Sequence, residues 1–233
     1  MPSEARYFIP VCLYPHTRYR TTAGLMTLFD KYDLRHHDHL MVVADRLLVL
    51  DRLMTGRYWT IPSAVHKAKQ EASQILKLIQ RTSFRSGARA RGAIVCWDEI
   101  AETAQYSDFA QRLQQAVLGD RMLADTIQAF VEQRAGRYGL GASPERERDY
   151  EREYLLSEVS MSVYCTEMLG FSNEVWERPP GADIPDPLKL LYGERRELIR
   201  RVTGQAATRV LTFVFPDAED SEQEVYEESR PEA

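Results

Sequence analysis

Cysteine is scarce in this chain, and the few cysteines present lie far apart. They are Cys12, Cys96 and Cys165 among 233 residues, and no Cys-x-x-Cys pair occurs. An odd number of distant cysteines does not make a disulfide framework, and a structural zinc site needs closely spaced pairs of ligands. The composition therefore excludes the small folds that depend on disulfides or zinc.

Long apolar runs are missing as well. No stretch approaches the roughly 18 residues that a membrane-spanning helix needs. The first residues, MPSEARYF, lack the charged and then apolar layout of a secretion signal. From these two features we expect a cytoplasmic protein without a membrane partner.

Three common functional fingerprints are also lacking. The sequence contains no GxGxxG, no GxxxxGK[ST] and no GxSxG motif, and it has no internal repeat. These motifs mark dinucleotide binding, phosphate-binding loops and α/β-hydrolase nucleophiles. The sequence therefore lacks the fingerprints of these three kinds of chemistry.

Charge is distributed unevenly along the chain. The net charge is −5, but residues 217–233 alone hold eight acidic residues and one arginine. Residues 61–91 show the opposite balance, with seven basic residues and one acid, Glu71. Acidic segments with few apolar residues are typically disordered. We expect one domain over residues 1–216 and a disordered acidic tail over 217–233.

Short apolar runs alternate with helical patterns. Strands are predicted at Phe8–Tyr14, His39–Asp45, Gly92–Trp97 and Arg209–Phe215. Helices are predicted at about residues 22–32, 47–54, 62–83, 105–118, 120–135, 144–169 and 188–202. This alternation predicts an α/β fold with a mostly parallel sheet and helices on both faces.

The carboxyl ends of the predicted strands carry candidate site residues. Cys12, Asp45 and the Trp97-Asp98 pair all fall at such ends, where ligands bind in parallel sheets. His16, Arg18 and Arg20 follow Cys12, and positive neighbours favour the thiolate form of a cysteine. Cys12 is thus a candidate nucleophile, although a small buried strand residue is the ordinary role of cysteine.

The segment REYLLSEVSMSVYC, residues 152–165, holds a second candidate pair. Tyr154 and Glu158 are four residues apart and are neighbours on one helix face. Glu158 falls on or beside the apolar stripe of that helix, where a carboxylate must be paired or must mark a polar pocket. A glutamate at the edge of the stripe that reaches water or an arginine is the alternative.

Residues 61–91 predict a basic surface. Lys67, Lys77 and Arg81 can share one side of a long helix, and only Glu71 opposes the positive charge. Such an excess suits a polyanion such as a nucleic acid, although a solvated helix face is the alternative. The run RHHDH, residues 35–39, invites a metal site, but adjacent residues in a turn do not easily converge on one ion, and we expect a solvated loop.

Taken together, several stretches resemble the cyclodipeptide synthases, which look like the catalytic domain of class I tyrosyl- and tryptophanyl-tRNA synthetases. The resemblance runs from about Tyr7 to Phe215. The stretches are FIPVCLYPHTRYR, VVADRLLVLDRLMTG with the basic helix after it, WDEIAETAQYSDFAQRLQQAV, YLLSE, EVWERPPGADIPDPLKLL and ATRVLTFVF. The family's fold is a Rossmann-like three-layer fold.

The sequence departs from the family pattern at two positions. The family's nucleophile is a serine in a Gly-x-Ser setting, and the matching segment here is Pro10-Val11-Cys12, with Tyr14 and Thr17 as alternatives for the nucleophile position. The family's later tyrosine falls on Trp176, followed by Glu177. The chain therefore resembles a divergent branch, such as the fungal arginine-containing cyclodipeptide synthases.

The resemblance implies a reaction in which two aminoacyl-tRNAs give a diketopiperazine through an aminoacyl-enzyme and a dipeptidyl-enzyme. Because the ester bonds already carry the energy, we expect no metal, nucleotide or organic cofactor. Cys12, Tyr154, Glu158 and Trp176 would be the catalytic residues. Asp45, Glu177 and His16 would line the substrate pocket. Residues on the basic segment would bind tRNA: Lys67, Lys69, Lys77, Arg81, Arg85, Arg89 and Arg91. We expect a monomer whose partner is aminoacyl-tRNA and not DNA.

Two other functions stay open from the sequence. Because the serine and the later tyrosine are both replaced, the chain could be a relative that binds tRNA without catalysis. A class I nucleotidyltransferase that uses ATP is a further alternative, but the His-x-Gly-His motif of that class is absent and PHTRY replaces it poorly.

Overall fold

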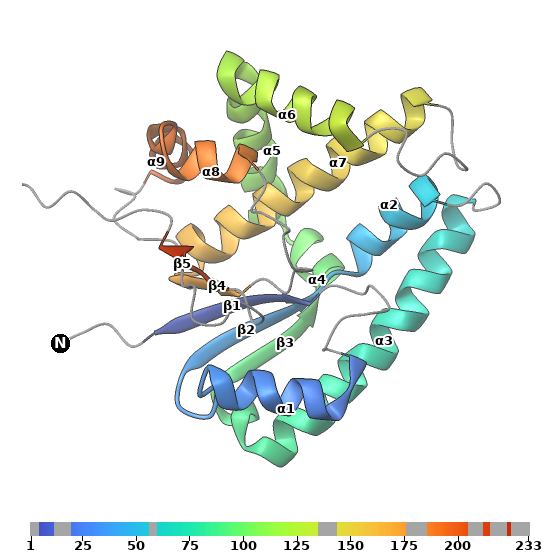
Figure 1. Ribbon diagram of the computed structural model, residues 1–233, viewed down its shortest axis with the longest axis vertical. Coiled ribbons are helices and arrows are strands. Elements are labelled where there is room, and N and C mark those ends of the chain that lie inside the picture. The colour runs from blue at the N-terminus through green and yellow to red at the C-terminus, as the bar shows by residue number, and fades with distance from the viewer. Residues whose placement is uncertain are drawn as a thin grey trace, which may run out of the picture.

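The computed structural model describes residues 5–11, 20–55, 60–134, 144–175, 186–204, 212–214 and 223–224. Six strands form one sheet in the order β3-β2-β1-β4-β5-β6 (Figure 1). They are β1 (Arg6–Val11), β2 (Asp38–Val43), β3 (Gly92–Cys96), β4 (Asn173–Val175), β5 (Thr212–Val214) and β6 (Gln223–Glu224). All neighbouring strands are parallel except β5 and β6. The order 3-2-1-4-5 is that of a Rossmann fold, which confirms the predicted fold class.

Helices cover both faces of this sheet. They are α1 (Thr22–Lys31), α2 (Asp45–Thr55), α3 (Ile61–Ser86), α4 (Trp97–Ala101), α5 (Ala104–Gly119), α6 (Arg121–Arg134), α7 (Pro144–Val163), α8 (Asp186–Tyr192) and α9 (Arg196–Thr203). A 3₁₀ turn, η2 (Ala88–Ala90), follows α3, and a π-helical turn, η3 (Tyr164–Met168), follows α7. None of the helices that the structure describes is long and apolar enough to span a bilayer.

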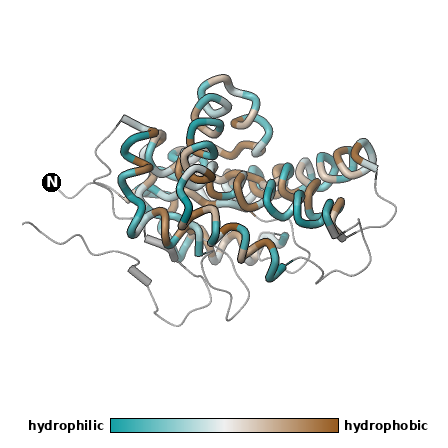
Figure 2. Tube along the Cα trace, turned by 90° about the horizontal axis from the view of Figure 1, so that it is seen from above, coloured by the Kyte–Doolittle hydropathy of each residue, from teal (hydrophilic) through white to brown (hydrophobic). Residues whose placement is uncertain are grey.

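Strand side chains alternate between two buried cores, as expected for a sheet covered on both faces. Ile9 and Val43 pack with α1 and α3, whereas Phe8 and Val42 pack with the core under α5 and α7. Figure 1 shows α1 and α3 on one side of the sheet and α5 to α9 on the other. Along several helices hydrophobic and hydrophilic positions alternate (Figure 2), because these helices meet the core on one side and solvent on the other. The second half of α7 is instead buried on nearly all sides.

Helix α3 shows how local sequence signals set the limits of an element. The hydroxyl of Thr60 accepts a hydrogen bond from the Ser63 amide and caps the helix, and Pro62 occupies its first turn, where a missing N–H costs nothing. The helix ends at Gly87, whose φ of 79° is a left-handed conformation that glycine adopts without strain. The predicted range of 62–83 is therefore confirmed within three residues.

One predicted helix is wrong in its extent. The single helix expected at 188–202 is two helices, α8 and α9, separated by a turn at residues 193–195. Gly193 interrupts the helix because glycine is unfavourable in a helix interior. Tyr192, at the end of α8, bonds through its hydroxyl to Thr166 Oγ1 over 2.6 Å, while the carbonyl of Val202 on α9 accepts from Arg112 on α5. The two helices are thus held by contacts with different elements, α8 by η3 and α9 by α5.

Part of the acidic segment also has regular structure. Gln223–Glu224, inside the range 217–233 that we expected to be disordered, forms β6 and pairs with β5. The three-residue strand β4 is too short to appear as an apolar run in the sequence. It lies at the stretch EVWERPPGADIPDPLKLL, which was singled out only by the family resemblance. Both strands are too short to show a period of two in the sequence.

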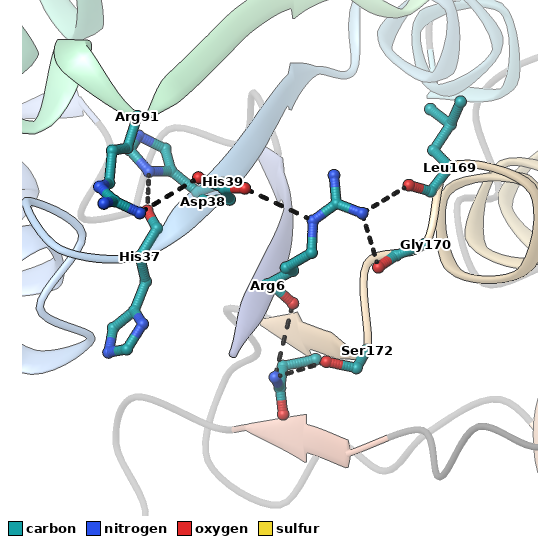
Figure 3. A network of polar contacts seen from close by, with 9 residues as sticks. Arg6, His37, Asp38, His39, Arg91, Leu169, Gly170 and Ser172 are labelled. Atoms are coloured by element: carbon teal, nitrogen blue, oxygen red, sulfur yellow. Dashed lines mark hydrogen bonds and ion pairs between the residues drawn. The ribbon is translucent and has the colours of Figure 1, made fainter. Parts of the chain in front are cut away.

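The amino-terminal edge of the sheet is tied by a polar network around Arg6 (Figure 3). Its guanidinium donates to the carbonyls of Leu169 and Gly170 at 3.0 and 3.2 Å and lies 3.8 Å from Asp38 Oδ2. Arg91 lies 3.7 Å from the other oxygen of Asp38. This network joins β1 and β2 to the end of the α7–η3 segment.

Candidate functional site

The change of direction in the strand order falls between β1 and β4. The chain goes from β1 to β2 and β3 on one side and reaches β4 on the other, and ligands in such sheets bind beyond the strand ends at this point. The described parts of β1 and β4 end at Val11 and Val175. Cys12 and His16 follow Val11, and Trp176 and Glu177 follow Val175, but these four residues, like Tyr14 and Thr17, lie outside the described residues.

Helix α7 passes over this point and presents polar side chains to it. Ser162 Oγ donates a hydrogen bond to Glu174 Oε2 of β4 at 2.5 Å, so this face of α7 is turned toward β4. Glu158 is one turn before Ser162, about 6 Å along the helix axis, and therefore shares its face. The first half of α7 lines the pocket of Asp45, which lies beyond the carboxyl end of β2. The helix therefore runs from the carboxyl edge of the sheet toward Glu174, and Glu158 lies nearer to that edge than Ser162 does. Glu158 thus lies one turn from the Ser162–Glu174 contact, in the direction of the carboxyl ends of the strands.

Tyr154 lies one further turn along the same face of α7. Its side chain is buried, with 7% exposure, and belongs to the core on the α5–α7 side of the sheet. The guanidinium of Arg134 lies 6.0 Å from the centre of its ring and also pairs with the buried Glu151 at 3.3 Å. Glu158 is only partly buried. Tyr154 is therefore held by packing, whereas Glu158 keeps contact with the surface.

Glu174 is a site residue that the sequence reasoning missed. It is fully buried in β4 at 0% exposure, two residues before Trp176. Burial of a carboxylate is unfavourable unless hydrogen bonds compensate, and Ser162 supplies one. The sequence carried little signal, because Glu174 stands between the polar Asn173 and Val175, and nothing local identified its partner on α7.

Asp45 lies in a pocket of about 270 Å³ between α2, α3 and α7. Its carboxylate is 4% exposed and accepts hydrogen bonds from the backbone N–H groups of Arg46 and Asp98 at 3.0 and 3.3 Å. Burial, with the nearby Asp98, raises the pKa of Asp45 to about 6. Lys69 lies 3.8 Å from Asp98, and within the described parts of the chain no cation lies within ion-pair distance of Asp45 itself. The pocket therefore offers a buried carboxyl group at the carboxyl ends of β2 and β3.

The two cysteines that the structure describes are poor nucleophiles. Cys96 is half-buried, and burial together with Asp45 raises its thiol pKa to about 12. Cys165 is buried, and burial raises its thiol pKa well above the ordinary value. Both thiols are protonated at neutral pH, so neither supplies a thiolate.

The basic side chains of residues 61–91 lie in three different settings. Lys77, Arg81, Arg85 and Arg89 are exposed at the carboxyl end of α3 and in η2, and no ion pair to a described residue is found for these four. Lys67 bonds to Gln70 at 3.2 Å on the same helix. Lys69 and Arg91 lie elsewhere, beside Asp98 and Asp38 respectively. Glu71 pairs with Arg52 and Arg20, so it does not neutralise the exposed cations.

The RHHDH run does not converge on one point. His36 bonds to Asp33 at 2.8 Å. Asp38 lies beside Arg6 and Arg91, and His39 is buried and bonds to the carbonyl of His37 at 3.0 Å (Figure 3). Among the described residues no group of three or more His, Cys, Asp or Glu side chains is placed to hold a metal ion.

Comparison with known proteins gives matches only to solved structures. No family model and no curated protein matches the sequence. The cyclodipeptide synthase of Fluoribacter dumoffii superposes with a TM-score of 0.68 at 16% identity, covering 91% of this chain and 89% of that one. The cyclodipeptide synthase of Streptomyces noursei gives a TM-score of 0.62 at 15% identity and covers 91% and 95%.

A third similar structure was solved with RNA. The cyclodipeptide synthase of Candidatus Glomeribacter gigasporarum, bound to Phe-tRNAPhe, gives a TM-score of 0.63 at 13% identity and covers 100% of this chain and 94% of that one. Likeness at such low identity shows a shared fold. The chain therefore has the fold found in cyclodipeptide synthases over nearly its whole length.

Proposed function

We propose that this protein is a tRNA-dependent cyclodipeptide synthase that forms a diketopiperazine from two aminoacyl-tRNAs. The observation that supports this most is the position of Glu158 on α7, one turn from the Ser162–Glu174 contact and toward the strand ends that Cys12 and Trp176 follow. This is the ligand position of a Rossmann fold, and the fold is shared with cyclodipeptide synthases, one of them bound to an aminoacyl-tRNA.

The first step of the proposed reaction is acyl transfer to Cys12. Its thiolate attacks the ester carbonyl of the first aminoacyl-tRNA, the carbon–oxygen bond to the tRNA ribose breaks, and the ribose oxygen takes a proton from water. Glu158 binds the α-ammonium group of the acyl residue and accepts its proton, which frees the amine for the next step. The hydroxyl of Tyr154 donates a hydrogen bond to the oxyanion or the amino group.

Two further acyl transfers complete the product. The freed amine attacks the ester of the second aminoacyl-tRNA, which forms the peptide bond and releases the second tRNA, and leaves a dipeptide on Cys12. The terminal amine of that dipeptide attacks the thioester carbonyl, closes the six-membered ring and returns the thiolate of Cys12. Both peptide bonds draw on the energy of ester bonds, so the sequence of steps needs no cofactor. Trp176 can pack or donate through its indole N–H, but it cannot accept a proton.

The amino-acid side chains would bind at the carboxyl edge of the sheet. We propose that Asp45, with His16 and Glu177, lines this pocket and prefers a basic side chain, as in the arginine-containing branch. The buried carboxyl group of Asp45 makes no ion pair with a described residue, and Lys69 in the same pocket pairs with Asp98 instead, which supports this preference. The exposed cations of α3 would bind tRNA phosphates.

Expression in bacteria with mass spectrometry of the medium tests the function. We expect a new cyclic dipeptide, whose mass names both amino acids, and its loss in Cys12→Ala and Glu158→Gln. Cys96→Ala is the matched control, because it removes a thiol that is protonated at neutral pH. A product that survives Cys12→Ala would move the nucleophile to Thr17 or Tyr14. With purified protein and charged tRNA, an intact-mass increase of one aminoacyl group on the wild type should be absent from Cys12→Ala.

A non-catalytic tRNA-binding protein is the second candidate, favoured by Trp176 at the place of the family's tyrosine. In that case purified protein binds tRNA, neither acyl-enzyme nor product forms with charged tRNA of all amino acids, and Cys12→Ala leaves tRNA affinity unchanged.

A further inference from the structure

Phe84 is a large aromatic side chain in an unusual position. It lies in the last turn of α3 and is 70% exposed, whereas Ile75 and Ile79 on the opposite side of the helix are buried in the core. The other large hydrophobic side chains that the described residues expose are aliphatic: Ile61, Leu118 and Met122. Exposure of a phenylalanine to this extent gives nothing to the stability of the fold.

The surroundings of Phe84 are positively charged. It lines an open hollow of about 430 Å³. The other residues that line this hollow are Lys77, Gln80, Arg81, Arg85 and Arg89. Lys77, Arg81 and Phe84 follow each other at spacings of four and three and so share one face of the helix. Because no described carboxylate neutralises the four cations, they present an unopposed positive field around one aromatic ring.

This combination identifies the chemistry of the ligand. Grooves that bind single-stranded nucleic acid combine cations that hold the phosphates with aromatic rings on which bases stack. Bases of double-stranded RNA are already stacked, so an exposed ring recognises an unpaired base. We propose that Phe84 stacks on an unpaired base of the bound RNA while the four cations bind the phosphates next to it. That the RNA is tRNA rests on the proposed function.

The position of Phe84 separates this contact from the reaction. Lys69 marks the carboxyl edge of the sheet through its contact with Asp98, and Phe84 is fifteen residues further along the same helix. At 1.5 Å per residue the two lie about 22 Å apart. The base at Phe84 is therefore not the aminoacylated terminal nucleotide but one that precedes it or lies elsewhere in the RNA, and its stacking would fix how the RNA approaches the site.

Binding of labelled RNA to the purified full chain tests the proposal. The probes are bulk bacterial tRNA, the same tRNA with its single-stranded 3′ end removed, a fluorescein-labelled single-stranded RNA and a blunt RNA duplex. We expect Phe84→Ala to weaken binding of the tRNA and the single strand about 5- to 100-fold, with an unchanged slope of log Kd against log salt. Arg81→Ala should instead reduce that slope by about 0.7 on the single strand. Phe84→Trp should retain binding and give an RNA-dependent change in fluorescence relative to the wild type.

The controls separate stacking from folding and from catalysis. Leu118→Ala removes an exposed apolar side chain outside the hollow and should not change affinity, and circular dichroism should show Phe84→Ala folded. If 3′ truncation removes the effect of Phe84→Ala, the base belongs to the 3′ end; if the effect persists, it lies elsewhere in the tRNA. Unchanged RNA affinity in Phe84→Ala, or equal weakening on the blunt duplex, would overturn the proposal. The proposal would also be overturned if polyglutamate, which has no bases, displaced the RNA from the wild type and if Phe84→Ala weakened polyglutamate binding as much as RNA binding. If the wild type binds tRNA and Phe84→Ala binds it equally well, the stacking proposal fails and the proposed function stands. If the wild type binds no tRNA, both the stacking proposal and the proposed function are contradicted.

Discussion

The hydroxyl of Ser162 donates a hydrogen bond to the buried carboxylate of Glu174, and this contact joins α7 to β4 at the candidate site. Removal of the donor leaves a buried carboxylate with one hydrogen bond fewer. We expect Ser162→Ala to lower the free energy of unfolding by about 1–3 kcal/mol, measured by urea denaturation. Ser157→Ala is the control, because Ser157 is also buried on α7 but bonds through its hydroxyl to no described residue. Equal losses in both variants would mean that packing, and not the hydrogen bond, matters at Ser162.

Glu158→Gln tests the proton-transfer role directly. Glutamine retains the size and the hydrogen-bonding oxygen of glutamate but cannot accept the proton of the α-ammonium group. We expect the rate of cyclic dipeptide formation to fall about 10²- to 10⁴-fold, with unchanged tRNA affinity. The same change at Glu145, which is exposed in the first turn of α7, should leave the rate unaltered. Retention of the wild-type rate in Glu158→Gln would remove Glu158 from the chemistry.

Asp45 should make stability depend on pH in an identifiable direction. Its pKa is raised from 3.8 to about 6 in the fold, so between these values the folded protein binds more protons than the unfolded chain. The contribution of the neutral carboxyl is complete below pH 3.8 and is lost as the pH rises through 6. The free energy of unfolding of Asp45→Asn relative to that of the wild type should therefore rise by about 1–3 kcal/mol from pH 4 to pH 8. Urea denaturation of both proteins at the two pH values measures this change.

Asp108→Asn provides the comparison for Asp45→Asn. Asp108 is exposed and pairs with Arg112 across one turn of α5, so its replacement should shift stability by less than about 0.5 kcal/mol at either pH. A pH-independent difference for Asp45→Asn would show that the carboxyl of Asp45 titrates normally.

The sequence predicted those elements whose signals are local. Helix α3 was predicted at 62–83 from the pattern that Pro62 opens, and the structure adds the caps at Thr60 and Gly87. The main parallel strands were predicted from apolar runs. Glu158 was identified as a candidate site residue from its spacing of four from Tyr154 and from the apolar stripe beside it. The partner that orients its helix face, Glu174 on β4, is close to Ser162 only in three dimensions, so no pattern in the sequence could reveal the pair.

Other features were missed because their meaning depends on the surroundings. Phe84 continues the helical sequence like any apolar residue, and only the packed structure shows that it faces solvent. Lys69 was grouped with the basic surface by composition, whereas the fold places it beside Asp98 in the Asp45 pocket. Gly193 is one residue in an otherwise helical pattern, and the break there depends on the separate anchors of α8 and α9.

Gly92 and His39 are opposite each other on β3 and β2, and no side chain fits between them. A Cβ atom added to Gly92 would lie 2.0 Å from His39 Nε2, and the His39 ring is buried and bonded to the carbonyl of His37. We expect Gly92→Ala to cost about 1–3 kcal/mol of unfolding free energy, because the ring has to leave its place. His39→Ala removes the obstruction, so in a double-mutant cycle Gly92→Ala should cost much less in the His39→Ala background. Additive costs would show that the restriction comes from the backbone of Gly92 and not from the imidazole.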